Sequence, residues 1–322
     1  MPAPRVSVVI PAYNEQDTIG NCLLAAVDQT VPLHEIIVVD NRSTDETVGI
    51  VKAFQYAHPD APIRLLHQDA AQGLVPTRNA GLDAATGEVI GRIDADSVLE
   101  PTWVEHVQAT FASDEVAAAS GPVVYYDMPL RRFGLRADDA LRRLMLRLAR
   151  EYYFLFGSNM AIRASAWREI RDEVCLDADE GLHEDIDLAV HLHEHRLPIA
   201  YVSSMVAGMS ARRLDDSPRD YLYYVRRFER TYRRHRVRRV GVHAPMLVFL
   251  GIYPALRVVR RSKELRAILE RMEPMGAPDR ARMPTPTPSA ALPPADAPGV
   301  AAGVAPSAAP AGAPAGAPDG GE

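Results

Sequence analysis

Cysteine is scarce in this 322-residue chain, and lysine is far outnumbered by arginine. The two cysteines, Cys22 and Cys175, exclude a disulfide scaffold and a cluster of metal-bound thiolates, so a reducing, cytoplasmic location is expected. The opening sequence MPAPRVSVVIPAYNE lacks the apolar run and cleavage site of a secretory signal and predicts a first β-strand instead. What is present, a 47% hydrophobic composition, suffices for the core of one large domain or two small ones.

Charge is spread unevenly along the chain. The net charge is −6, yet the segment from Arg212 to Arg266 holds 16 basic and 5 acidic residues. This cationic segment of an acidic protein favours an anionic partner. From about Glu273 onward proline, alanine and glycine dominate, which predicts a disordered tail because these residues offer little apolar surface to offset the entropy of ordering.

Four apolar runs in the first third of the chain predict strands. Each run is continuously apolar, as in strands buried on both faces: RVSVVIP (5–11), EIIVVD (35–40), IRLLHQD (63–69) and EVIGRID (88–94). Helical patterns separate the runs. This alternation predicts an α/β fold with a mostly parallel central sheet and helices on both faces.

Local signals place the ends of some of these helices. Apolar residues recur at helical spacing over 19–27. Ser43 with Glu46 is typical of a capping box that begins the next helix, and Gly87 fits the C-cap of the helix before it.

Acidic side chains follow the predicted strands, at the edge where ligands of parallel sheets bind. A cluster of carboxylates at one edge needs cations or hydrogen-bond donors to neutralise it. Helix capping is the alternative for any single residue, and it accounts less well for all of them together. The residues at the strand ends are Pro11 to Glu15, Asp40, Asp69, Asp94 and Asp96.

Four segments resemble, in order, the motifs of family 2 glycosyltransferases. They are VSVVIPAYNE, IIVVDNRSTDET, GLVPTRNAGLDAATGEVIGRIDADS and HEDIDLAVHL, and the resemblance covers Arg5 to Val202. It implies the GT-A (nucleotide-diphospho-sugar transferase) fold over residues 1–210. After this domain we expect a basic, helical C-terminal region over 211–272 and then the disordered tail over 273–322.

The resemblance also implies a divalent cation, Mn²⁺ or Mg²⁺, bound by carboxylate oxygens. Asp94-Ala95-Asp96 matches the family's DxD motif. Alternate residues of an extended segment point the same way, so both carboxylates can face one ligand. By this analogy Asp96 is the direct metal ligand, and Asp94 contacts the ribose or a metal-bound water.

Other matched positions are expected to bind the nucleotide donor. Asp40 matches the contact to the base, and Tyr13 could stack on it, although a strand-end aromatic is more often simply packed. Arg78 matches a position near the nucleotide or its phosphates, with a surface helix arginine as the alternative. The remaining expected donor-binding residues are Pro11, Glu15 and Gly73.

Catalysis and the acceptor are expected on later segments. Asp185 matches the family's catalytic base and Glu184 its neighbour, with an acidic helix-capping pair as the alternative. Gly157, Ser158 and Asn159 in FGSNMAIR match the acceptor-side wall, or else form a tight turn into a core strand.

Histidines gather near this acidic pair. His191 and His195 share a helix face, but Leu192 stands where a zinc-binding HExxH pattern needs glutamate. Solvated helix histidines are therefore predicted over a zinc site for His183, His191, His193 and His195.

Two features depart from the family pattern. The Q-x-x-R-W motif of processive synthases is absent, so repeated addition of sugars is disfavoured. The segment SARRLDDSPRDY is present instead, and its Arg212 and Arg213 are expected to form either a mobile lid over the donor diphosphate or a solvated pair. The segment Val240 to Val259 approaches a membrane span in length, yet His243, Pro254 and other polar or breaking residues interrupt it. It predicts an interfacial segment that suits a lipid-linked acceptor, or else a buried helical hairpin.

These features predict an inverting, metal-dependent and non-processive glycosyltransferase of cell-envelope or exopolysaccharide synthesis. Its partners would be a nucleotide diphosphate sugar and a glycan or lipid-linked acceptor, with peripheral contact at the inner face of the plasma membrane and no nucleic acid. The alternatives are a non-catalytic nucleotide-sugar-binding protein and a sugar-nucleotide pyrophosphorylase. The latter needs a glycine-rich phosphate loop that IPAYNEQDTIG lacks.

Overall fold

The computed structural model describes residues 2–149, 154–177, 181–238 and 240–272. The predicted tail over 273–322 therefore lies outside the described residues. The strands are β1 (Val6–Ala12), β2 (Glu35–Asp40), β3 (Ile63–His67), β4 (Val89–Ile93), β5 (Val98–Leu99), β6 (Ala118–Ser120), β7 (Val123–Tyr125), β8 (Asn159–Arg163), β9 (Ile199–Tyr201) and β10 (Ala207–Met209).

The helices lie between and after these strands. The first seven are α1 (Ile19–Val27), α2 (Thr47–Ala57), α3 (Leu74–Ala84), α4 (Trp103–Thr110), α5 (Arg131–Ala149), α6 (Ala164–Ile170) and α7 (Glu184–Glu194). The C-terminal ones are the 3₁₀ helix η1 (Arg212–Asp215), α8 (Pro218–Arg234), the 3₁₀ helix η2 (Val240–His243), α9 (Ala244–Arg261) and α10 (Lys263–Met272).

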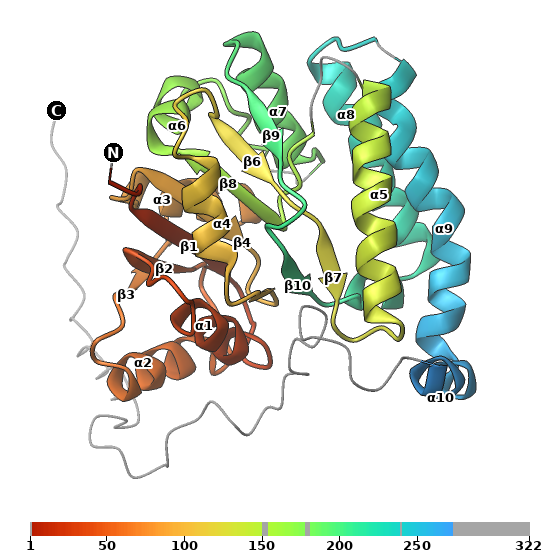
Figure 1. The fold of residues 1–322 in the computed structure, drawn as a ribbon, viewed down its shortest axis with the longest axis horizontal. Helices are drawn as coiled ribbons and strands as arrows, with labels where there is room; N and C mark the ends of the chain where they lie inside the picture. Colours follow the sequence, from red (N-terminus) through yellow and green to blue (C-terminus); the bar gives the residue numbers. More distant parts are fainter. Residues whose placement is uncertain (1, 150–153, 178–180, 239, 273–322) are drawn as a thin grey trace, which may run out of the picture.

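A seven-stranded sheet in the order β3-β2-β1-β4-β8-β6-β9 forms the centre of the molecule. The first four strands pair in parallel, and β8 runs antiparallel between β4 and β6. A three-stranded sheet, β5-β10-β7, lies beside it (Figure 1). The prediction of a mostly parallel central sheet is confirmed, and all four predicted strands are present.

Helices cover both faces of the sheet, as predicted (Figure 1). On one face α1, α2 and α4 pack on the sheet through a core that includes Leu23, Phe54 and Trp103. On the other face α3, α6 and α7 do so through a core that includes Trp167 and Leu188. Every residue of β1, β2 and β4 is buried, whereas β3 is an edge strand in which only Ile63 is buried. The prediction that β3 is buried on both faces was wrong, because β2 is its only strand partner among the residues that the structure describes.

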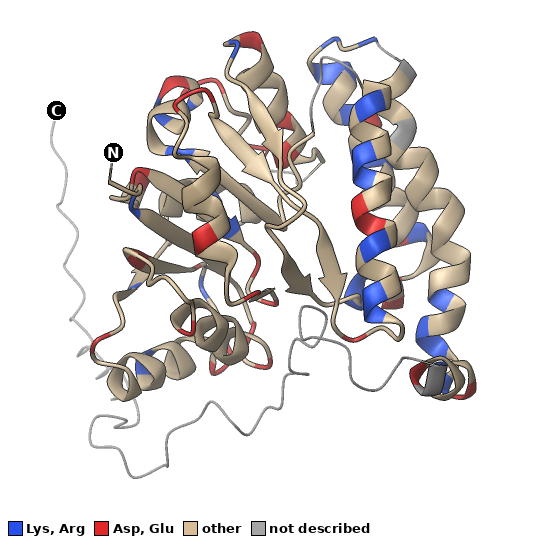
Figure 2. Cartoon of the chain, in the orientation of Figure 1, with Lys and Arg blue, Asp and Glu red and all other residues tan. Residues whose placement is uncertain are grey.

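The C-terminal helices form a separate layer with α5. Residues of α5, α7, α8 and η2 share one hydrophobic cluster, which includes Met145, Ile186, Phe228 and Val242. The blue Lys and Arg positions on the ribbon of Figure 2 mark α5 as well as α9, so the cationic character predicted from residue 212 onward extends to an earlier helix. The domain boundary at residue 210 stays a prediction.

Two predicted helix ends differ from the structure. The helix expected to begin with a Ser43–Glu46 capping box begins at Thr47, without a side-chain cap at Glu46. The helix expected to end at Gly87 ends at Ala84. Gly87 instead lies against Ser7, where an added Cβ would come within 2.5 Å of Oγ.

Candidate active site

The loop after β1 is held by the start of α2. Ser43 Oγ accepts a hydrogen bond from Asn14 N at 3.0 Å, and Thr47 Oγ1 accepts one from Glu15 N at 2.8 Å. Asn14 has a positive φ of 54°, a backbone conformation that asparagine tolerates better than most residues. Ser43, one of the two residues that suggested a capping box, and Thr47 therefore hold the loop that carries Glu15 at the carboxyl end of the sheet.

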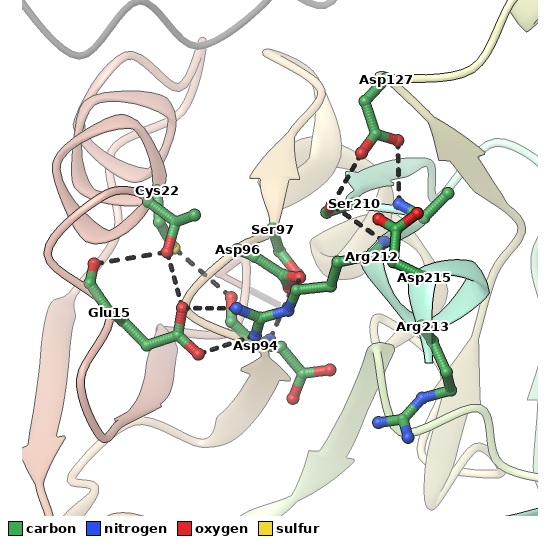
Figure 3. Close-up of polar contacts among 12 residues, drawn as sticks. Glu15, Cys22, Asp94, Asp96, Ser97, Asp127, Ser210, Arg212, Arg213 and Asp215 are labelled. Carbon is green, nitrogen blue, oxygen red and sulfur yellow. Dashed lines mark hydrogen bonds and ion pairs between the residues drawn. The ribbon is translucent and has the colours of Figure 1, made fainter. Parts of the chain in front are cut away.

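Asp94 and Asp96 follow β4 at the same edge. Asp94 pairs with Arg78, and Asp96 is 5% exposed. Arg212 enters from η1 and joins the carboxylates, with its Nε 3.0 Å from Asp96 Oδ2 and its Nη2 2.7 Å from Glu15 Oε1. Figure 3 shows the guanidinium between these two acids. The structure thus brings together the expected donor-site residues Glu15, Asp94 and Asp96, and it places the expected cation Arg212 among them.

The carboxyl group of Asp96 is held in an environment that disfavours its charge. Burial raises its pKa to about 7, and the neighbouring charges of Asp94 and Glu15 add to this while Arg212 opposes it. A bound divalent cation would relieve the same repulsion. The electrostatics therefore fit a cation site formed by oxygen ligands.

Arg213 lies apart from its neighbour. Its guanidinium carbon stands 4.0 Å from the centre of the Tyr224 ring, and Figure 3 draws no contact between Arg213 and the carboxylates. Of the two arginines expected to close over a diphosphate, only Arg212 contacts this cluster.

Arg78 and Arg92 connect the segment of Asp94 and Asp96 to the start of α7. Arg78 pairs with Asp94 and Glu184, and Arg92 Nη2 lies 3.1 Å from Glu184 Oε1. Although burial opposes ionisation of Glu184, the two arginines lower the pKa of this carboxyl group. Arg78 is 6% exposed, so the alternative of a surface arginine was wrong. Sequence reasoning missed Arg92, although a charged residue within the apolar strand β4 is an unusual signal.

Asp185 stands at the other end of this network. Its Oδ2 accepts a hydrogen bond from Gly157 N at 3.0 Å, and burial followed by the charge of Glu184 raises the pKa of Asp185. Gly157 is required here because an added Cβ would lie 2.0 Å from Arg92 Nη2. Ile186 N also donates to Asp185 Oδ1 at 3.0 Å, and a carboxylate with a raised pKa that is oriented by such hydrogen bonds suits proton transfer.

The acceptor-side segment divides into two parts. Gly157 and the half-buried Ser158 lie at the turn beside Asp185. Asn159, however, is fully buried: its Nδ2 donates to Pro122 O and Met205 O, while its Oδ1 accepts from Trp103 Nε1. The expected place of Asn159 on the acceptor side is corrected, because its bonding capacity is used in the core.

The remaining expected donor residues line the edge on the β2 side. Asp40 is 4% exposed and accepts a hydrogen bond from Ser43 N at 3.3 Å, whereas Tyr13 is 49% exposed and open to a ligand. Gly73 has φ 136° and donates from its N to Asn41 Oδ1 at 2.7 Å, a conformation that favours glycine. Pro11 is buried within β1.

The prediction of solvated histidines was wrong for His183 and His191. His183 is 5% exposed, and burial lowers its pKa to about 3. His191 is 8% exposed on the inner side of α7. His195 is more accessible and pairs with Glu169 and Glu173.

The model of the family described as "Glycosyl transferase family 2" matches residues 7–171. Glycosyltransferase AglE of Haloferax volcanii is 35% identical over 38% of this chain and 40% of its own length. The succinoglycan biosynthesis protein ExoO of Rhizobium meliloti is 34% identical over 48% and 44%. The putative glycosyltransferase EpsH of Bacillus subtilis is 29% identical over 55% and 50%. The chain thus spans half or less of each of these relatives.

Solved structures share the fold. The mannosyltransferase PcManGT from Pyrobaculum calidifontis, in complex with GDP-Man and Mn²⁺, has a TM-score of 0.56 at 21% identity, over 84% of this chain and 79% of its own. TarS of S. aureus in complex with UDP has a TM-score of 0.53 at 16% identity, over 80% and 75%. These likenesses confirm the predicted GT-A fold.

Proposed function

The chain belongs to glycosyl transferase family 2, and on that basis we propose that it transfers a sugar from a nucleotide diphosphate donor to an acceptor hydroxyl with inversion. The observation that carries this proposal is Arg78, which pairs with Asp94 on the donor side and with Glu184 beside Asp185. Residues from three separate segments thereby form one polar site. The named role of ExoO in succinoglycan biosynthesis supports a place in cell-envelope or exopolysaccharide synthesis.

Asp185 acts as the general base. Its carboxylate takes the acceptor's hydroxyl proton while the oxygen attacks the anomeric carbon from the face opposite the diphosphate. The bond from that carbon to the phosphate oxygen breaks, and the nucleotide diphosphate leaves with the electron pair. The hydrogen bond from Gly157 N orients the carboxylate, and burial keeps its pKa raised for this task.

The donor lies along the carboxyl edge of the sheet. Asp40 contacts the base, and the exposed ring of Tyr13 stacks on it. Asp94 contacts the ribose, and Asp96 with Glu15 offers the carboxylate oxygens that Mn²⁺ or Mg²⁺ prefers. When bound there, such a cation supplies positive charge against the departing diphosphate.

Arg212 exchanges partners during this reaction. Without a ligand it neutralises Glu15 and Asp96, and with the donor bound it moves to the diphosphate. Its 3₁₀ helix is tied to α9, because Arg260 Nη2 lies 2.8 Å from Asp215 Oδ2 and Arg257 Nη1 donates to Leu214 O at 3.3 Å. The C-terminal helices thus determine where Arg212 can reach.

Helix α9 provides a peripheral contact with a membrane. The segment Gly241–Arg261 is long and apolar enough to span one, with a mean hydropathy of 1.6, although only 18% of its apolar window is buried. Leu247, Leu250 and Val258 are exposed along one side, and basic residues flank the helix. An apolar side with cationic ends favours an interface of anionic lipid, where a lipid-linked acceptor would be delivered.

Vesicle sedimentation tests this contact. The full chain should bind vesicles of anionic phospholipid and not neutral ones, and Leu247→Glu with Leu250→Glu should abolish that binding. Leu176→Glu, at an exposed leucine away from α9, serves as the matched control and should bind normally. Equal binding by both variants would refute a contact through α9.

A donor screen tests the activity itself. The full chain is incubated with each common nucleotide sugar, with Mn²⁺ or with EDTA, and release of the nucleotide diphosphate is measured. Slow, metal-dependent hydrolysis of one donor is expected even without an acceptor, because water can replace the hydroxyl. Metal-dependent binding of a donor that is never hydrolysed or transferred would favour a non-catalytic binding protein instead. Failure to bind any donor would refute the proposal.

A further inference from the structure

Four side chains with metal-binding atoms meet where α7 packs on the end of α8. Cys175 comes from the segment after α6, Asp187 and His191 from α7, and His235 from the residue that follows α8. Cys175 Sγ, an Asp187 oxygen and a His235 nitrogen lie within 4.8 Å of one another. Asp187 is two residues from Asp185, and a helical rotation of about 200° directs it to the opposite side of α7. The cluster is therefore separate from the sugar-transfer site.

His191 completes the group from one turn further along α7. Its Nε2 lies 3.7 Å from Asp187 Oδ1, the oxygen that His235 Nε2 approaches to 2.7 Å. The two imidazole rings stand nearly perpendicular, at 83°, with their centres 5.0 Å apart. Both histidines and the cysteine thus surround one carboxylate.

The imidazole of His191 is the unusual member. The residue is only 8% exposed, and neither ring nitrogen has a hydrogen-bond partner among the described residues. Carboxylate oxygens of Glu194 and Glu173 approach Nδ1 to 3.3 and 3.5 Å without hydrogen-bond geometry. Burial of a polar ring without a partner is costly, and a bound ligand on Nε2 would remove that cost.

The ligand types favour zinc over the cations that suit the donor site. One thiolate, two imidazoles and one carboxylate are a borderline-soft set that Zn²⁺ binds tetrahedrally, whereas Mg²⁺ and Mn²⁺ prefer oxygen. Bonds of about 2.0 Å to nitrogen or oxygen and about 2.3 Å to sulfur would place the ligand atoms roughly 3.3–3.7 Å apart. The contact between His235 Nε2 and Asp187 Oδ1, at 2.7 Å, would have to lengthen by about 0.6 Å, whereas His191 Nε2, at 3.7 Å from the same oxygen, is already near this spacing. His191 lies outside the 4.8 Å group of the other three side chains and would have to move closer to Cys175 when a metal binds.

Neighbouring groups already orient the ligands. Cys175 N donates to Asp187 Oδ2 at 2.9 Å, which leaves Oδ1 directed at the two histidines. Arg234 Nε donates to Cys175 Sγ at 2.9 Å, but burial and the neighbouring Asp187 still raise the pKa of this thiol to about 11, so a bound metal would have to displace its proton. Such outer contacts are typical of metal sites and raise their affinity.

We propose that Cys175, Asp187, His191 and His235 bind one zinc ion that clamps α7 to the end of α8. The site is structural, because four protein ligands leave no open position for a substrate. Its effect would reach the transfer site through α7, whose first turn carries Glu184 and Asp185. This inference does not depend on the proposed sugar transfer.

Metal analysis of the full chain tests the proposal. Protein expressed with zinc in the medium and dialysed against buffer with Mg²⁺ should retain about one zinc per chain, as expected for a four-ligand site. Cys175→Ser and His191→Ala should each retain less than about 0.1 zinc. His195→Ala, at the residue that follows α7 and outside the cluster, is the matched control and should retain the full amount.

Cobalt spectroscopy of the unmutated chain removes any dependence on how the variants fold. After zinc is removed, Co²⁺ should give the absorption of a tetrahedral site together with a thiolate-to-cobalt band. Prior alkylation of Cys175 should eliminate that band. A zinc-free protein that gives no tetrahedral cobalt spectrum would overturn the proposal, as would full zinc retention by both ligand variants.

Discussion

Glu35 and Asp96 are both buried carboxylates at the ends of central strands, yet their surroundings are opposite. Glu35 begins β2 at the amino edge of the sheet, and Asp96 follows β4 at the carboxyl edge. Burial by itself would raise the pKa of both groups. At Glu35 the backbone NH and hydroxyl of Thr86, with Ser7 and Arg64, more than offset burial and lower the pKa to about 2. At Asp96 burial prevails and the pKa rises to about 7.

The difference separates a carboxylate whose hydrogen bonds lie within the sheet from one that we propose binds a ligand. The donors to Glu35 come largely from the adjacent strand and the segment before β4, so this carboxylate is satisfied within the sheet. Asp96 faces the like charges of Asp94 and Glu15, and its cation is a half-exposed arginine of η1. A buried acid that lacks fixed donors is a place for a ligand. The following substitutions test this distinction.

The largest effect is expected for Asp185→Asn. The amide keeps the shape of the side chain but cannot accept the hydroxyl proton, so turnover should fall about 10²- to 10⁴-fold. Donor affinity should stay nearly unaltered, because Asp185 adjoins Glu184, and Arg78 stands between Glu184 and the Asp94 that we propose contacts the donor. Transfer or hydrolysis rates are measured beside donor affinity, with the exposed Asp114→Asn as a control. Near-normal turnover would remove Asp185 from the mechanism, and lost donor binding would move it to the nucleotide site.

Asp96→Asn should abolish the metal dependence of donor binding. Loss of a ligand oxygen should lower the affinity for Mn²⁺ and donor by at least 10- to 100-fold. The fold should remain intact, because the substitution removes a charge that its neighbours repel. Calorimetric titration of the donor with and without Mn²⁺ measures this effect. Donor affinity that is independent of Mn²⁺ and equal in both proteins would contradict the metal assignment.

Arg212→Ala should have two smaller and opposite effects. Removing the competing cation should strengthen Mn²⁺ binding about fivefold in the absence of donor, since a half-exposed ion pair contributes about 1 kcal/mol. Turnover should fall about tenfold, because a charge-assisted contact to the diphosphate is lost. Arg213→Ala is the matched control, since Arg213 stacks on Tyr224, and it should change neither quantity. Equal effects of both substitutions would refute a specific role for Arg212.

Glu35→Gln should leave turnover per folded molecule unchanged and lower the free energy of unfolding by about 1–3 kcal/mol. Because folding lowers the pKa of Glu35 from 4.5 to about 2, the folded state binds fewer protons than the unfolded state between these values. The stability that Glu35 contributes is thus present above about pH 4.5 and is lost as the pH falls through about 2. Urea unfolding of both proteins at pH 7, 5, 4 and 3 should show the difference shrinking. A pH-independent difference would attribute the loss to packing alone.

The sequence predicted the first half of the sheet because its signals are local. Continuous apolar runs marked the first four strands, and parallel pairing of β1, β2, β3 and β4 places their carboxyl ends at one edge. The position of Asp94 and Asp96 at that edge followed from the same pattern. Local signals failed at Gly87, where close approach to Ser7, and not a helix end, requires a glycine.

The sequence itself determined three features: the types of residue in the site, the strands that precede them and the cationic character of the C-terminal helices. These features depend on periodicity and composition, which are properties of neighbouring residues. Only the tertiary structure decided which of those residues face one another. It placed Asn159 in the core and Arg92 at the site, and directed Arg212 but not Arg213 to the carboxylates. It also buried His191 beside His235. These contacts join segments 44 to 197 residues apart, and their formation depends on how whole helices pack on the sheet, which no local pattern records.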